Sequence, residues 1–181
     1  IQPAGFAFAI WGLIYVLIFI WMIKLFFSKN DQSAITERLK YWPIINFLLN
    51  GIWIIVFTQQ WVIISTVVIL ALLFTLVKMH TIISVELYHW YDRLPFSIYF
   101  GWVTIASLVN IFTAFSNYSI DSFLGMSELL WTIIAIMAAS FIGIFTAWFF
   151  NDWLYPLVLI WPFFGIYMEN DDVFTGLNVS L

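Results

Sequence analysis

The fold is decided by a long apolar stretch near the start of the chain, FAFAIWGLIYVLIFIWMIKLFF, which runs from Phe6 to Phe27. It contains a single charged side chain, Lys24. A helix of this length rises far enough to cross the hydrocarbon core of a bilayer, which is about 30 Å thick. We therefore predict that this stretch spans a membrane.

The composition of the whole chain indicates the same environment. Of the 181 residues, 64% are hydrophobic and 9% are charged, whereas a soluble domain carries about 25% charged side chains. Cysteine is absent, which excludes disulfides, thiol catalysis and cysteine-ligated metal centres. With a net charge of −4, the chain lacks a basic surface for nucleic acid, so we expect no nucleic-acid partner.

Five further apolar runs follow the first one. They cover Trp42 to Phe57, Trp61 to Val77, Pro95 to Phe115, Glu128 to Phe150 and Trp153 to Met168. The connections between them are short, and the chain has no room for a separate soluble module. The sequence therefore predicts an all-α, polytopic membrane helical bundle with about six transmembrane helices, folded as a single domain over residues 1–181.

Three prolines bear on the shape of the later runs. Pro95 suits the first turn of the fourth run, where a missing N–H costs no hydrogen bond. The sixth run is shorter and contains Pro156 and Pro162, which predict kinks whose freed carbonyls find partners inside the bundle.

The stretch from His80 to Arg93 mixes charged and aromatic residues, as is typical of a headgroup interface. We expect it either to extend the third helix or to lie on the membrane surface. Glu86 and His89 have the i, i+3 spacing of two ligands on one helix, but one such pair is a weak signal. We therefore expect His80, Glu86 and His89 to be solvated, and we predict no metal site.

The cationic residues indicate an orientation. Lys24, Lys29, Arg38 and Lys40 flank the loop at residues 28–40, and Lys78 and Arg93 flank the loop at residues 80–94. Two loops separated by a pair of spans lie on the same side of the membrane. Because short cationic loops stay in the cytoplasm, we predict that both loops are cytoplasmic and that the N-terminus lies outside.

Catalytic residues are not apparent in the predicted spans. None carries a central Lys, Arg, Asp or Glu, which disfavours pumps, proton relays and retinal-type Schiff bases. Lys24 and Lys78 lie near helix ends, where snorkelling to the interface explains them. No catalytic triad, phosphate-binding glycine loop or carboxylate pair can be placed in one site. We expect the protein not to be an enzyme.

Polar and aromatic side chains recur at helical spacing in three of the runs. They are Trp11 and Tyr15 in the first run, Asn46, Asn50, Trp53 and Phe57 in the second, and Tyr99, Trp102, Ala106 and Asn110 in the fourth. Each set lies on one helix face. An asparagine in hydrocarbon is costly unless it is hydrogen-bonded, so Asn50 and Asn110 either bond across helices or contact a ligand.

The tryptophans divide into two groups by their place in the runs. Those near helix ends, where an interfacial belt is expected, are Trp42, Trp61, Trp90 and Trp153. Trp11, Trp53 and Trp102 lie deeper. These three either line a pocket for a flat ligand or pack in the core.

At these positions the chain resembles the translocator protein family, also called tryptophan-rich sensory proteins or TspO/MBR proteins. The motifs are Pro3 followed by Trp11-Gly-Leu-Ile-Tyr15, then Asn50-x-x-Trp53-x-x-x-Phe57, then Tyr99-x-x-Trp102-x-x-x-Ala106-x-x-x-Asn110. The chain departs from the family pattern at Ile98 and Ala9, where the family has prolines, and at Asn46, where it has glutamine. A sixth span also exceeds the usual five, so the resemblance implies a divergent, enlarged member.

The resemblance implies an intrabundle cavity that binds porphyrins, sterols or related flat hydrophobic ligands. The implied ligand-binding residues are Trp11, Tyr15, Asn50, Trp53, Tyr99, Trp102, Ala106 and Asn110. We expect a sensor that needs no cofactor other than such a porphyrin or lipid ligand. Its expected partners are membrane lipid, a hydrophobic small molecule, and a second copy or another membrane subunit. A transporter of an uncharged or lipidic solute and a scaffold subunit of a larger membrane complex are the alternatives.

Overall fold

The computed structural model describes residues 5–27, 33–86, 90–117 and 128–169. Every regular element in these ranges is a helix. The elements are the 3-10 helix η1 (Gly5–Ala9) and the α-helices α1 (Ile10–Phe27), α2 (Ser33–Leu39), α3 (Trp42–Thr58), α4 (Val62–Glu86), α5 (Trp90–Asn117), α6 (Glu128–Phe150) and α7 (Leu154–Glu169). Pro3, Lys29 and His89 lie outside the described residues. The long helices coincide with the predicted apolar runs, which confirms the all-α membrane bundle.

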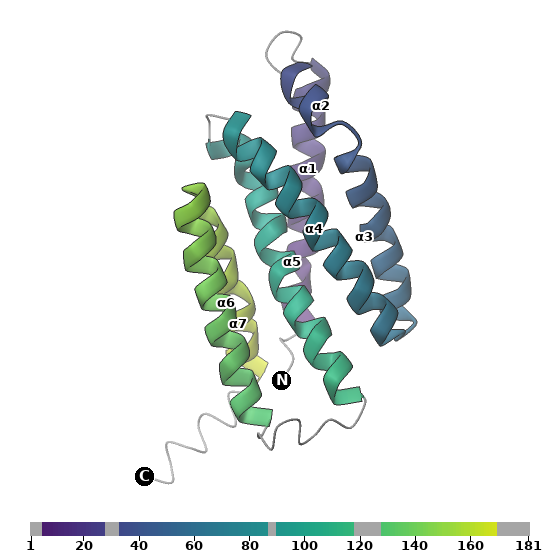
Figure 1. Ribbon diagram of the computed structural model, residues 1–181, viewed down its shortest axis with the longest axis vertical. Coiled ribbons are helices and arrows are strands. Elements are labelled where there is room, and N and C mark those ends of the chain that lie inside the picture. Colours follow the sequence, from purple (N-terminus) through teal and green to yellow (C-terminus); the bar gives the residue numbers. More distant parts are fainter. Residues whose placement is uncertain (1–4, 28–32, 87–89, 118–127, 170–181) are drawn as a thin grey trace.

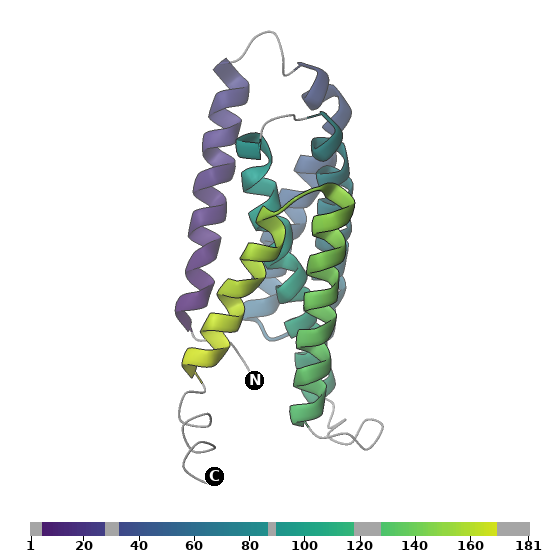
Figure 2. The same ribbon diagram turned by 90° about the vertical axis from the view of Figure 1, so that its left-hand side faces the viewer.

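The long helices run side by side along the long axis of the molecule (Figure 1). α5 is the central helix, because it packs against α1, α4, α6 and α7. α3 packs against α4 on one side of the bundle, and α6 and α7 form a pair on the other side (Figure 2). The main core follows α5, where Tyr99 and Val103 are buried together with Leu72 of α4 and Tyr155 of α7.

Three helical stretches within the described ranges are long and apolar enough to cross a bilayer: Gly5–Phe27, Val62–Val85 and Trp90–Phe115. Shorter apolar helices cover Trp42–Thr58 and Ile136–Phe150, and α7 has 16 residues. Bilayers accommodate short helices by local thinning and by snorkelling of flanking residues. On α6, Phe141, Ile144 and Trp148 are exposed along one face, which suits contact with lipid.

α4 continues well past the predicted end at Val77 and ends at Glu86. For the first part of the stretch from His80 to Arg93, this confirms the alternative in which the stretch extends the third helix. The buried stripe of Leu72, Leu76, Met79 and Ile83 keeps helical spacing through Lys78. Lys78 itself is exposed and does not interrupt this stripe. Its ammonium lies over the ring of Phe74, 5.4 Å from the centroid, as expected for a snorkelling lysine.

The prolines act differently from the prediction in two places. α5 begins at Trp90, so Pro95 lies inside the helix rather than in its first turn. Pro156 lies in the first turn of α7, where its missing N–H interrupts no helical bond. Pro162 is inside α7. Of the two prolines predicted to kink the sixth run, only Pro162 therefore lies inside the helix.

The described cations gather at one end of the bundle, the upper end in Figure 1. They are Lys24, Arg38, Lys40, Lys78 and Arg93. The helix termini near them are the end of α1, the short α2, the end of α4 and the start of α5. We call this the cationic end of the bundle.

Candidate ligand-binding site

Trp11 of α1 lies where α1, α3 and α5 meet, and its ring contacts four other aromatic rings. The distances between ring centroids are 5.5 Å to Trp53, 5.7 Å to Tyr15, 5.9 Å to Tyr99 and 6.3 Å to Trp102. These are contact distances for aromatic pairs. We call these five residues, together with Asn50, the aromatic cluster. The structure thus brings most of the predicted site residues together.

Helical spacing explains why these side chains converge. Trp11 and Tyr15 lie one turn apart on α1, and Asn50 and Trp53 lie one turn apart on α3. Tyr99 and Trp102 have the same spacing on α5. Each helix therefore contributes two members of the cluster from a single face.

The aromatic cluster has a buried interior and an exposed edge. Asn50, Trp53, Tyr99 and Trp102 are all buried, whereas 44% of Tyr15 is exposed. The hydroxyl of Tyr15 donates a hydrogen bond to Oδ1 of Asn50, over 3.0 Å. This bond joins α1 to α3 at the edge of the cluster.

Four buried polar atoms of the cluster have no hydrogen-bond partner within the described residues. They are Nδ2 of Asn50, Nε1 of Trp53, the hydroxyl of Tyr99 and Nε1 of Trp102. The Tyr99 hydroxyl lies near Asn50 without reaching good hydrogen-bond geometry. An unpaired buried polar group costs about 1–3 kcal/mol, so four in one place are unusual in a core made only for packing.

All four of these atoms can donate a hydrogen bond, and the cluster contains no charged side chain. Such a site suits a flat, apolar molecule that carries hydrogen-bond acceptors. It offers no nucleophile with an adjacent base and no pair of carboxylates. The chemistry available here is recognition by stacking and hydrogen bonding.

The rings of the cluster are in contact with one another, so no planar ligand fits between them in this arrangement. Trp11 lies between the rings of Trp53, Tyr99 and Trp102, and it is only partly buried. The intrabundle cavity expected from the family resemblance is therefore occupied by a side chain at this level. A ligand would enter the cluster by displacing the ring of Trp11.

Ala106 and Asn110 extend the same face of α5 but lie beyond the cluster. Asn110 accepts a hydrogen bond from Ser65 of α4 through Oδ1, over 3.0 Å, and donates to the carbonyl of Ala106, over 3.0 Å. Its amide is thus engaged in joining α4 to α5. Asn46 plays a similar part, because its Nδ2 donates to Thr75 of α4 over 2.8 Å. Between the two alternatives stated for Asn50 and Asn110, these contacts favour interhelical bonding for Asn110, and Asn46 bonds across helices in the same way.

His80 was expected to be solvated at the interface, and that expectation is wrong. Only 1% of His80 is exposed, and its Nε2 lies 3.2 Å from Oδ2 of Asp152 in the α6–α7 turn. The hydroxyl of Ser97 donates to the same oxygen over 2.5 Å. Phe100 and Phe150 pack on the imidazole. His80 is buried because α4 continues as a helix past Val77 and carries the imidazole into the bundle beside Asp152.

The Asp152 carboxylate is buried, yet it is held in its charged form. Burial raises the pKa of Asp152, but the contact with His80, the hydrogen bonds from Ser97 and the Leu154 backbone, and the attraction of the His80 charge together outweigh burial and leave this pKa below its usual value. The backbone N–H of Leu154 donates to Oδ1 over 3.0 Å. Sequence reasoning missed this pair because His80 and Asp152 lie far apart in the chain, and no periodic pattern connects them.

Lys24 also has a partner that the sequence did not indicate. Its ammonium forms an ion pair with Asp92 at the start of α5 and lies 4.8 Å from the centroid of the Tyr91 ring. The ion pair attaches the cationic end of α1 to α5. No group of three or more His, Asp or Glu that could hold a metal ion occurs in the described ranges.

Apolar helices, an aromatic cluster between three of them, and polar side chains that pair between helices define a polytopic integral membrane protein. The comparison with known families agrees: the family model described as TSPO-like protein matches residues 1–180. The chain belongs to this TSPO-like family, as its motifs predicted. Comparisons with curated proteins and with solved structures find no match.

Proposed function

We propose that the protein is a ligand-binding sensor in the membrane, which holds a porphyrin-, sterol- or lipid-like molecule in the aromatic cluster. Membership of the TSPO-like family supports a ligand-binding role in a membrane. The observation that carries the proposal is the set of four buried, unpaired donors around Trp11. A ligand with acceptor atoms would satisfy these donors and stack on the surrounding rings.

Among these ligand classes, a porphyrin suits the aromatic cluster best. A porphyrin presents a wide flat surface together with several acceptors, namely ring nitrogens and carboxylate oxygens. A sterol presents one hydroxyl and would leave most of the four donors unpaired. Two of the four unpaired donors belong to α3 and two to α5, so a ligand wide enough to reach both helices would pair with more of them.

The edge at Tyr15 is the proposed entrance. α1 packs mainly against α5, and the Tyr15–Asn50 hydrogen bond is its polar link to α3. If this bond opens, the Trp11 ring can move toward the exposed side of α1. A hydrophobic ligand would then enter sideways from the lipid between α1 and α3.

We further propose that the cationic end of the bundle faces the cytoplasm, as the positive-inside rule predicts. The buried acidic residues Asp92 and Asp152 lie at this same end, paired with Lys24 and His80.

The test is an equilibrium titration of the detergent-solubilised full chain with protoporphyrin, its dimethyl ester and cholesterol, followed by porphyrin absorbance and by competition. Trp102→Phe keeps an aromatic ring but removes one unpaired donor, and Trp153→Phe is the matched control on an exposed tryptophan. We expect Trp102→Phe to weaken protoporphyrin binding about tenfold and Trp153→Phe to leave it unchanged. Equal binding by both variants, or no binding by the parent, would reject the site.

A further inference from the structure

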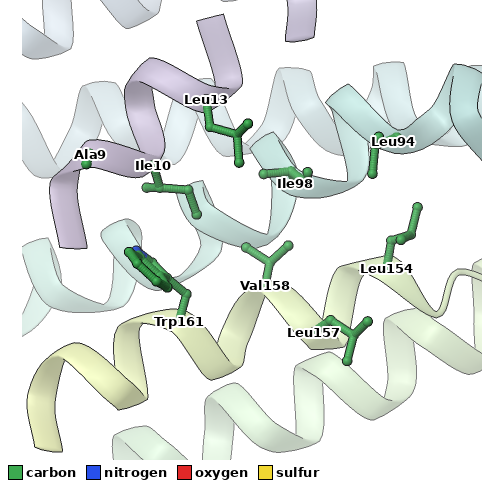
Figure 3. Close-up of a pocket in the computed structure, with 9 residues that line it drawn as sticks. All are labelled: Ala9, Ile10, Leu13, Leu94, Ile98, Leu154, Leu157, Val158 and Trp161. Atoms are coloured by element: carbon green, nitrogen blue, oxygen red, sulfur yellow. The ribbon is translucent and has the colours of Figure 1, made fainter. Parts of the chain in front are cut away.

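A second hollow lies between α1, α5 and α7, on a neighbouring face of α5. Its volume is about 370 Å³, and Figure 3 shows the side chains that line it. Leu13 of α1, Leu94 and Ile98 of α5, and Leu157 and Trp161 of α7 are among the side chains around it. None of its lining residues belongs to the aromatic cluster. The volume falls within the usual range of small-molecule sites, about 300–1,000 Å³.

The lining of this hollow offers no free polar group. Its side chains are aliphatic except for Trp161, whose Nε1 donates to the carbonyl of Ala7 over 3.0 Å. The aromatic cluster, in contrast, holds four unpaired donors. An occupant of the α1–α5–α7 hollow therefore needs no acceptor atoms, which selects an alkyl chain over a porphyrin or a sterol hydroxyl.

The hollow opens toward the membrane. Leu13 and Leu157 at its rim are about half exposed, and both belong to helices whose outer faces meet hydrocarbon. Water would gain no hydrogen bonds in this hollow, so we expect the hollow to be filled by a molecule from the surrounding lipid.

A cationic residue, Arg93, borders one end of the hollow in the chain. Arg93 directly precedes the lining residue Leu94, at the cationic end of the bundle. Its guanidinium makes two long hydrogen bonds, of 3.4 Å to the carbonyl of Phe150 and 3.5 Å to that of Asn151. Nε is buried without a partner, so an anion would meet the two terminal nitrogens, and no carboxylate pairs with Arg93 within the described residues. A phosphate would complete this site, because guanidinium groups bind phosphate with high preference.

We propose that the α1–α5–α7 hollow binds one phospholipid, with an acyl chain in the hollow and the phosphate at Arg93. The lipid fills the gap that α7 leaves against α1 and α5, so it acts as a structural ligand of the bundle. This site is separate from the proposed porphyrin site, and either proposal can fail without the other.

Native mass spectrometry of the full chain, reconstituted with dioleoylphosphatidylglycerol and then transferred to mild detergent, tests this proposal. We expect one retained phospholipid per chain. Leu157→Trp replaces an aliphatic side chain with a bulky indole that fills the hollow, and it should lower the retained fraction about tenfold. Ile160→Trp, on the same helix but outside the lining, is the matched control and should retain the lipid.

Two further experiments distinguish the contribution of the acyl chain from that of the phosphate headgroup. Arg93→Gln should reduce retention of the phospholipid, and dioleoylglycerol, which has the same chains but no phosphate, should be retained less than the phospholipid. Leu13→Phe repeats the filling test from α1 in case Leu157→Trp does not fold. Equal retention by the filled variants and the control would overturn the acyl-chain site. Equal retention of dioleoylglycerol would overturn the phosphate contact.

Discussion

The hydroxyl of Tyr15 on α1 donates a hydrogen bond over 3.0 Å to Oδ1 of Asn50 on α3, at the exposed edge of the aromatic cluster. The bond links two helices that otherwise pack mainly against other neighbours, α1 against α5 and α3 against α4. It therefore lies where a ligand from the membrane would first meet the cluster. Opening and binding should both depend on it.

Removing this hydrogen bond should make the cluster easier to enter. We predict that Tyr15→Phe raises the association rate of protoporphyrin about three- to twentyfold, since an interhelical hydrogen bond in a membrane contributes about 0.6–1.7 kcal/mol. Stopped-flow absorbance measures the rate. Tyr41→Phe, at an exposed position outside the cluster, is the control. An unchanged rate in Tyr15→Phe would exclude this edge as the entrance.

Asn50 of α3 and Asn110 of α5 should respond differently to the same substitution. Asn50→Leu removes an unpaired donor of the cluster and should weaken protoporphyrin binding about tenfold. Asn110→Leu removes the bond to Ser65 and should lower the free energy of unfolding by about 1 kcal/mol while binding is retained. Titration and thermal unfolding of both variants separate these roles. The reverse pattern would show that Asn110, not Asn50, contacts the ligand.

Acid should loosen the α6–α7 turn. A carboxyl with a lowered folded-state pKa stabilises the fold above its unfolded pKa, and this stabilisation is lost as pH falls through the folded value. We therefore predict that the melting temperature drops as pH falls below about 4, the usual aspartate pKa. In Asp152→Asn this part of the pH dependence should disappear. Glu37→Gln, at an exposed carboxylate, should keep the parent's profile.

The contact between α5 and α7 depends on a small residue. A Cβ on Gly101 would lie 3.0 Å from Cβ of Val158 and 3.2 Å from the carbonyl oxygen of Tyr155, which is backbone and cannot move aside cheaply. We predict that Gly101→Ala lowers the free energy of unfolding by about 1–3 kcal/mol. Gly51→Ala has open space around the new Cβ and should be neutral or stabilising, because alanine favours helix. If denaturation gave the same free energy of unfolding for both variants, the close approach of α7 to Gly101 would be refuted.

The helices could be predicted because each run of apolar residues is bounded by charges, prolines or polar pairs that the bundle keeps outside hydrocarbon. The convergence of Trp11, Trp53 and Trp102 could also be predicted, since helical spacing and family motifs both place them on inward faces. Trp61, Trp90 and Trp153, expected in an interfacial belt, are exposed near helix ends.

Pairings between distant segments could not be predicted. His80 and Asp152 are each ordinary interfacial residues by sequence, and only the length of α4 and the position of the α6–α7 turn bring them together. The engagement of Asn110 with Ser65 depends equally on the register of α4 against α5. Periodicity assigns a face to a residue, but the partner on the neighbouring helix follows from packing.

The central claim is that the aromatic cluster binds a flat, acceptor-bearing ligand through donors that the protein itself leaves unpaired. Its most direct test is the protoporphyrin binding isotherm of the double variant Trp53→Phe, Trp102→Phe, which keeps two aromatic rings and removes both indole donors. We predict an affinity about 100-fold weaker than that of the parent, with an unchanged helical content. An isotherm that superimposes on the parent's would contradict the claim.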